Sequence, residues 1–172
     1  GTRPETLSRA TSLALSTAQG QMFRTEERES LCDLLLPPEG YRVVGAVATT
    51  YSLDFVALTA VAGALGDCRL ADEGDWSAPE IARAVLGLKT RLVIFVNQGT
   101  VSSGSAGRAH RLSCLYDRVI VPISIRGGAF HPKIWVVKYE PLRRGRLPSR
   151  YRLTCSSRNI TTANTWECGV VL

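Results

Sequence analysis

Two short runs of apolar, β-branched and aromatic residues in the last third of this 172-residue chain constrain its fold most strongly. They cover residues 134–139 and 151–155, and a connection rich in Pro, Gly and Arg separates them. This composition is typical of β-strands, and the spacing predicts a hairpin. The hairpin would bring two polar groups side by side, because His-Pro-Lys at 131–133 precedes the first run and Ser-Ser-Arg-Asn at 156–159 follows the second.

Extended backbone gives the side chains within each polar group a common orientation. Successive side chains of a strand point to opposite faces, so His131 and Lys133 share one face. The same rule applies to Ser157 and Asn159. An imidazole, an ammonium, a hydroxyl and an amide gathered in one place suit phosphodiester chemistry, which needs a nucleophile and groups that hold the phosphate oxygens.

This constellation resembles the signature of the phospholipase D superfamily, which is H-x-K, then a small residue, Ser, any residue and Asn, and then an acidic residue. The chain has HPK, SSRN and Glu167. A weaker resemblance covers residues 49–55, which look like the opening of phospholipase D-like nuclease domains. Two positions depart from the pattern, because Lys138 replaces the family's Asp and Ser156 replaces a Gly. Many nuclease members lack that Asp, so the resemblance favours a nuclease over a lipase.

The resemblance implies a covalent mechanism in which His131 is the nucleophile or the acid. Lys133 and Asn159 would hold the phosphate. Ser157 would orient it, and Glu167 would hydrogen-bond an imidazole nitrogen and fix its tautomer. No metal and no cofactor is expected, since the cations and the covalent intermediate do that work. The mechanism uses two histidines, so the second is expected from a homodimer mate or from a second motif in a missing half.

Basic residues concentrate around the motif. The chain carries +6, but residues 108–158 hold twelve Lys or Arg against two acidic residues, which is +10 for that segment. A concentrated positive field attracts polyanions, so a nucleic acid is the expected partner, DNA rather than RNA. The residues expected to contact it are Arg108, Arg111, Arg126, Lys138 and Arg158. A solvated basic face is the alternative interpretation.

The order of the remaining elements predicts an α/β fold, with a mixed β-sheet flanked by helices. The resemblance implies the same α/β/α sandwich. Strands are expected at 41–49, 91–96 and 119–125, helices at 4–18, 25–36, 53–65, 77–88 and 108–116, and a loop at 99–107. Residues 1–36 would form a helical segment and residues 37–172 the phosphodiesterase domain. The last apolar strand begins at Cys168 and stops short, so we expect the first half of a longer protein or a compact single-motif protein.

Other protein classes fit the sequence poorly. The five cysteines are scattered and form no C-x-x-C pair, which argues against a disulfide framework and a structural zinc site. No apolar run approaches the roughly 18 residues of a spanning helix, and no signal segment opens the chain, so a cytoplasmic protein without a membrane partner is expected.

Three functions are therefore compatible with the sequence. The first is a nuclease, within a restriction or antiviral defence complex or beside a helicase or other ATPase. The second is a nucleic-acid-binding or dimerisation module whose site is latent or inactive. The third is a phospholipid phosphodiesterase or transferase, which the missing Asp and the basic segment disfavour.

Overall fold

The computed structural model describes residues 30–66, 78–88, 91–102, 113–143, 145, 147–162 and 168–172. Leu31–Leu172 form one compact unit. Its first helix, α2 (Leu31–Leu35), therefore belongs with the sheet, whereas the sequence places the domain boundary at residue 37. The helix predicted at 4–18 and the first part of the helix predicted at 25–36 lie outside the described residues.

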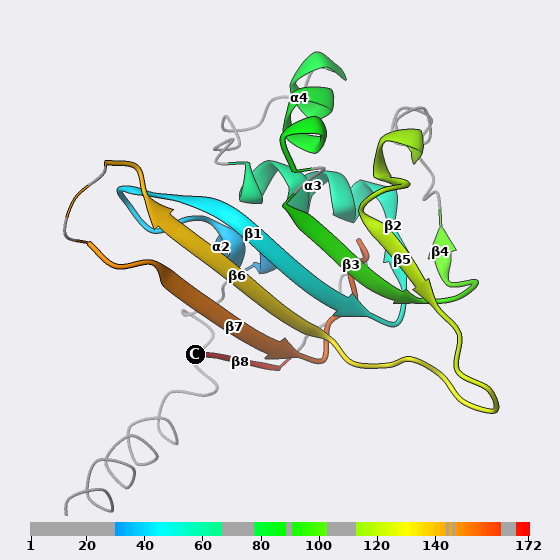
Figure 1. Cartoon of the computed structure of the whole chain (residues 1–172). Helices are drawn as coiled ribbons and strands as arrows, with labels where there is room; N and C mark the ends of the chain where they lie inside the picture. The colour runs from blue at the N-terminus through cyan, green and yellow to red at the C-terminus, as the bar shows by residue number, and fades with distance from the viewer. Residues whose placement is uncertain are drawn as a thin grey trace, which may run out of the picture. The chain divides into compact units, whose positions relative to one another are not determined.

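The unit is built on a mixed β-sheet, as the sequence predicts (Figure 1). The described strands are β1 (Tyr41–Thr50), β2 (Leu53–Asp54), β3 (Leu92–Asn97), β4 (Val101–Ser102), β5 (Ile120–Ile123), β6 (Ile134–Pro141), β7 (Arg150–Ser156) and β8 (Gly169–Val171). Six of them form one sheet in the order β5-β3-β1-β6-β7-β8, and β2 pairs with β4. The strands β1, β3 and β5 are parallel, while β6, β7 and β8 pair in antiparallel fashion.

One face of the sheet carries the core. Burial alternates strictly along β3, where Leu92, Ile94 and Val96 are buried and their neighbours are not. The same alternation buries Trp135 and Val137 in β6. A period of two is what a strand shows when only one of its faces is covered.

Three α-helices contribute to this core: α2, α3 (Phe55–Leu65) and α4 (Ala78–Leu88). The helix α3 begins where it does because Asp54 precedes it in extended conformation and its Oδ1 accepts a hydrogen bond from Ala57 N at 2.7 Å. A 3₁₀ turn, η2 (Ser113–Tyr116), adds the buried Tyr116. None of the described helices is long and apolar enough to cross a membrane.

The opposite face of the sheet is open and carries an apolar row. Val47, Val136 and Leu153 lie in one row across β1, β6 and β7 and are 44%, 42% and 39% exposed. Within the described ranges, the helices pack on the other face alone (Figure 1). The predicted mixed α/β sheet is therefore confirmed, whereas the predicted flanking by helices is met on one face only.

The predicted hairpin is confirmed, since β6 and β7 pair with Ile134 opposite Cys155. The predicted helix at 53–65 starts two residues late, because Leu53 and Asp54 form β2. Their partner is β4, which lies in the segment predicted as a loop at 99–107. Local pattern does not reveal a two-residue strand whose partner is so distant in sequence.

Candidate active site

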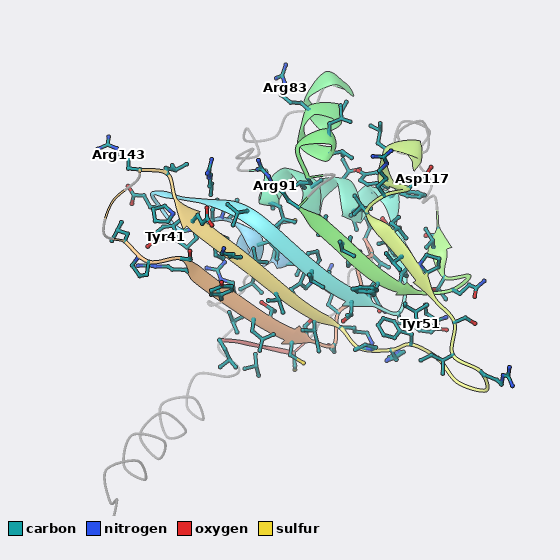
Figure 2. All side chains as sticks on the ribbon, viewed as in Figure 1. Tyr41, Tyr51, Arg83, Arg91, Asp117 and Arg143 are labelled. Carbon is teal, nitrogen blue, oxygen red and sulfur yellow. The ribbon has the colours of Figure 1, made fainter. Side chains whose placement is uncertain are left out.

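Two of the predicted polar groups and the β1–β2 connection meet at the carboxyl end of β1. The hairpin brings the first two together, since Ser156 N donates to Lys133 O at 3.0 Å. The connection joins them through Tyr51 N, which donates to Asn159 Oδ1 at 3.2 Å. Figure 2 labels Tyr51 at this end of the sheet and Arg143, near the hairpin tip, at the other end. The basic hairpin tip is therefore remote from the motif.

His131 and Lys133 contact each other directly. Lys133 Nζ lies 2.9 Å from His131 Nδ1, 3.4 Å from Nε2 and 3.2 Å from the backbone oxygen of His131. Nζ is thus near both ring nitrogens, and which of them accepts its hydrogen bond depends on the tautomer of the imidazole. The two side chains share one side, as the sequence predicts, although β6 begins only at Ile134. The pairing of β6 with β1 ends at Trp135 opposite Ala48, and the next residue, Ile134, donates its N–H to the Thr49 hydroxyl at 2.9 Å instead of to the β1 backbone.

Asn159 uses its side-chain oxygen to fix the turn after β1. Oδ1 accepts from Tyr51 N at 3.2 Å, from Ser52 N at 3.3 Å and from Thr50 Oγ1 at 3.3 Å. These contacts assign the orientation of the amide, because only an oxygen accepts hydrogen bonds from backbone N–H groups. The Asn159 Nδ2, a pure donor, is the atom of this side chain that suits a phosphate oxygen.

The residues after Asn159 are anchored in the core. Ile160 is 1% exposed, and its N donates to Thr50 Oγ1 at 3.1 Å while its O accepts from Asp54 N at 2.9 Å. Asp54 Oδ2 accepts from Thr162 N at 2.7 Å and from Thr162 Oγ1 at 3.1 Å. Asp54 itself is 5% exposed. The segment that follows Asn159 is therefore fixed by the burial of Ile160 and by its hydrogen bonds to Asp54, the residue that precedes α3.

Ser157 contacts the segment of β8, and Arg158 lies near α2. Ser157 N donates to Cys168 O at 3.0 Å, and Ser157 Oγ accepts from Cys168 N at 3.3 Å, so this serine ties the hairpin to the segment of β8. Arg158 lies within electrostatic reach of Cys32 on α2. Burial and then the charge of Asp33 raise the pKa of the Cys32 thiol, and the Arg158 charge opposes them.

Arg126 and Lys138, two more of the residues predicted to contact nucleic acid, lie on the bend before His131 and on β6. Arg126 is exposed on the bend between β5 and His131, where Gly127 has a φ of +72°. Lys138 lies five residues beyond Lys133 on β6 and pairs with Glu140 at 3.1 Å. The hydrogen bond from Lys138 to the Glu140 carboxylate is the main cause that raises the pKa of Lys138. The other expected site residues, Glu167, Arg108 and Arg111, lie outside the described residues.

Comparison with known proteins yields likeness in structure only. No protein-family model and no curated protein matches the sequence. The tyrosyl-DNA phosphodiesterase of yeast has 12% identity and a TM-score of 0.42 over 80% of this chain and 26% of that chain. The polyphosphate kinase of Porphyromonas gingivalis has 17% identity and a TM-score of 0.37 over 82% of this chain and 20% of that chain. The chain thus spans about a quarter or less of these proteins. At TM-scores this low, the likeness assigns neither a family nor an activity.

The sequence interpretation missed several residues that build the site. The ring of Tyr51 lies 4.8 Å from the His131 imidazole, centroid to centroid, at an interplanar angle of 42°. Asn97 Oδ1 accepts from Phe130 N at 2.8 Å and so fixes the residue before His131. A signal was available, since Asn97 and the residues after Thr50 stand at the carboxyl ends of parallel strands, where α/β sheets bind their ligands.

The groups gathered here suit an anion. Lys133 supplies a positive charge, Asn159 supplies an amide donor, and His131 supplies an imidazole that is exposed to solvent. Among the described residues, no three His, Cys, Asp or Glu side chains are placed to hold a metal ion. The arrangement can hold a phosphate group beside a nitrogen nucleophile.

Proposed function

We propose that the chain is a metal-independent phosphodiesterase that acts on nucleic acid through a covalent phosphohistidine at His131. One observation carries the proposal: Lys133 Nζ lies 2.9 Å from His131 Nδ1 at the strand end to which Asn159 is also tied. A nucleophile, a cation and an amide donor are the parts that phosphodiester cleavage needs.

Substrate binding would rearrange the His131–Lys133 pair. A phosphate oxygen is a far stronger partner for an ammonium than a neutral imidazole nitrogen, because the hydrogen bond joins opposite charges. Lys133 would therefore turn from Nδ1 to the phosphate, and Asn159 Nδ2 would donate to a second oxygen. The released imidazole would take the tautomer with its proton on Nδ1, reached by proton exchange with solvent. Nδ1–H would then donate to a carboxylate, the role proposed for Glu167, and the lone pair would lie on Nε2.

The reaction would proceed in two displacements. Nε2 of His131 attacks phosphorus, a P–N bond forms, and the P–O bond to the leaving group breaks while a second, protonated histidine gives its proton to the leaving oxygen. Water then attacks phosphorus, the second histidine takes the water proton, and the P–N bond breaks. The products are a phosphomonoester and an alcohol, and both histidines return to their first states.

The second histidine would be His131 of a second copy of the chain. A two-fold axis brings each residue near its own mate, so one motif per chain is sufficient for a shared site. A second motif elsewhere in a longer protein is the alternative source. Ser157, whose hydroxyl accepts from Cys168 N, would help to orient the phosphate, the role that the resemblance implies.

Nucleic acid is the proposed substrate because the segment that contains the motif, residues 108–158, is strongly basic. Arg126, on the exposed bend before His131, is the best placed of the predicted contacts to meet a phosphate backbone. We retain DNA as the proposed substrate. We also retain a defence complex or a helicase as the proposed partner, which the family resemblance alone carries.

Cleavage of labelled single- and double-stranded DNA and RNA in excess EDTA tests the proposal. Wild type should cleave at least one substrate, and His131→Ala and Lys133→Ala should not. His110→Ala is the matched control, because it removes the chain's other histidine and should leave cleavage intact. Light scattering should report a dimer. Cleavage that EDTA abolishes, or that persists in His131→Ala, contradicts the mechanism, and salt-dependent binding without cleavage supports a binding module instead.

A further inference from the structure

Tyr51 is the aromatic neighbour of the proposed nucleophile. Its ring centroid is 4.8 Å from that of the His131 imidazole, at an angle of 42°. Aromatic rings attract each other at this separation in tilted arrangements. His131 is exposed, whereas Tyr51 is half-buried, so the ring of Tyr51 is the more firmly held partner. Contact with it restricts where the imidazole can turn.

The backbone of Tyr51 is held from both sides. Its N–H donates to Asn159 Oδ1 at 3.2 Å, and its carbonyl accepts from Thr100 Oγ1. The Thr100 hydroxyl also lies 2.7 Å from Asn97 O and shares its one proton between the two carbonyls, so it joins the ends of β1 and β3. Both polar groups of Tyr51's backbone thus meet side chains from distant parts of the chain. The ring of Tyr51 is therefore presented from a fixed backbone.

The imidazole of His131 is consequently held in two different ways. Lys133 holds a ring nitrogen through a hydrogen bond, and Tyr51 contacts the ring itself. A phosphate competes for Lys133 but offers nothing that would displace an aromatic ring. When Lys133 turns to the phosphate, Tyr51 remains as the described contact that orients the imidazole.

We propose that Tyr51 is a positioning residue that orients His131 for attack, and that Asn159 acts on His131 through Tyr51 as well as on the phosphate. The catalytic part of this inference rests on the proposed function. The contact between the rings of Tyr51 and His131 does not depend on the proposed function. The phenol ring is the working group, since the contact with His131 is one of rings, and the hydroxyl is not required.

Proton NMR of the imidazoles in the full chain tests the inference, with Tyr51→Phe and Tyr51→Leu beside wild type. The chain has two histidines, so His131→Ala assigns the His131 signals and His110 serves as an internal reference. An aromatic ring shifts the resonances of protons beside it. We expect Tyr51→Leu to move the His131 ring protons, Tyr51→Phe to leave them close to wild type, and the His110 signals to stay in place in both.

Kinetics separate positioning from substrate contact. A tilted ring contact of this kind is worth a rate factor of about 2- to 10-fold, so Tyr51→Leu should lower kcat by that factor with KM nearly unchanged. Tyr51→Phe should restore kcat. A raised KM with normal kcat would overturn the inference, because it would mean that Tyr51 binds substrate.

Two outcomes distinguish failure of this inference from failure of the proposed function. If the His131 signals do not move in Tyr51→Leu, the inferred ring contact is overturned, whether or not the protein cleaves substrate. If the His131 signals move as expected but wild type cleaves no substrate, the ring contact is supported and the proposed phosphodiesterase activity is refuted. Should Tyr51→Leu not fold, the nuclear Overhauser effect between the Tyr51 and His131 rings in wild type decides, since its presence supports the contact and its absence overturns it.

Discussion

Replacing Asp54 by alanine removes a carboxylate that joins two distant parts of the chain. Oδ1 caps α3 by accepting from Ala57 N at 2.7 Å, and Oδ2 accepts from the N–H and hydroxyl of Thr162 at 2.7 and 3.1 Å. Asp54 is 5% exposed, so water cannot readily replace these partners. We therefore expect a large loss of stability from a single change.

The magnitude follows from the two halves of the carboxylate. Loss of an N-cap costs about 0.5–2 kcal/mol. Thr162 is exposed, so water can replace its acceptor, and losing its hydrogen bonds to the carboxylate costs about 0.5–1.5 kcal/mol more. The free energy of unfolding of Asp54→Ala should thus fall by roughly 1–3.5 kcal/mol. The free energy of unfolding of Asp54→Ser should fall by less, because serine caps a helix well but is too short to reach Thr162.

Urea denaturation followed by circular dichroism measures these values, and the slope with denaturant should stay unchanged if only the folded state is affected. The expected order of stability is wild type, then Asp54→Ser, then Asp54→Ala. A loss below about 0.5 kcal/mol in Asp54→Ala, the usual range for surface changes, would refute the reasoning. Equal losses in both variants would show that the helix cap contributes nothing.

Three further outcomes are expected. Asn159→Asp keeps an acceptor for the turn after β1, so it should fold like wild type. It should lose cleavage, because a negative charge replaces the donor Nδ2. Cleavage above about a tenth of the wild-type rate, a change in the activation barrier of only about 1.4 kcal/mol, would contradict this. Burial raises the pKa of Tyr116 above its usual 10 against a smaller lowering by Thr59, so the folded form keeps this proton to higher pH and stability should fall as pH rises through and beyond about 10. Denaturation at about pH 8 to 11, which brackets the ordinary tyrosine pKa, should show a flatter profile for Tyr116→Phe, and an identical profile would refute the assignment. Arg152 donates to the carbonyls of Leu34 and Leu36, so Arg152→Met should lose about 1.5–3 kcal/mol in urea denaturation, and an unchanged midpoint would contradict that role.

Much of the fold could be predicted from local pattern. β1 and the β6–β7 hairpin are runs of apolar and β-branched residues, and α4 carries Pro79 in its first turn. These elements need no information from distant residues. The pairing of β2 with β4 was missed because Leu53 and Val101 lie far apart in sequence and each strand has two residues.

The polar residues of the candidate site could be predicted from the sequence, whereas the residues that position them could not. His131, Lys133 and Asn159 have a recognisable order and spacing, whereas Tyr51 and Asp54 act through contacts that only the folded chain creates. Thr100 is an example, since its hydroxyl reaches a carbonyl that precedes it by 49 residues. The open face with its apolar row also escaped prediction, because apolar side chains at both parities of β6 suggest helices on both faces.

The most direct measurement is a search for a covalent adduct on His131 during turnover. Wild type would be mixed with substrate, quenched in alkali, where phosphohistidine survives, and digested for mass spectrometry. The proposed mechanism predicts a substrate-derived phosphoryl group on the peptide that contains His131, and none on the His110 peptide. Substrate cleavage without any such adduct, or with the adduct on another residue, would contradict the central claim.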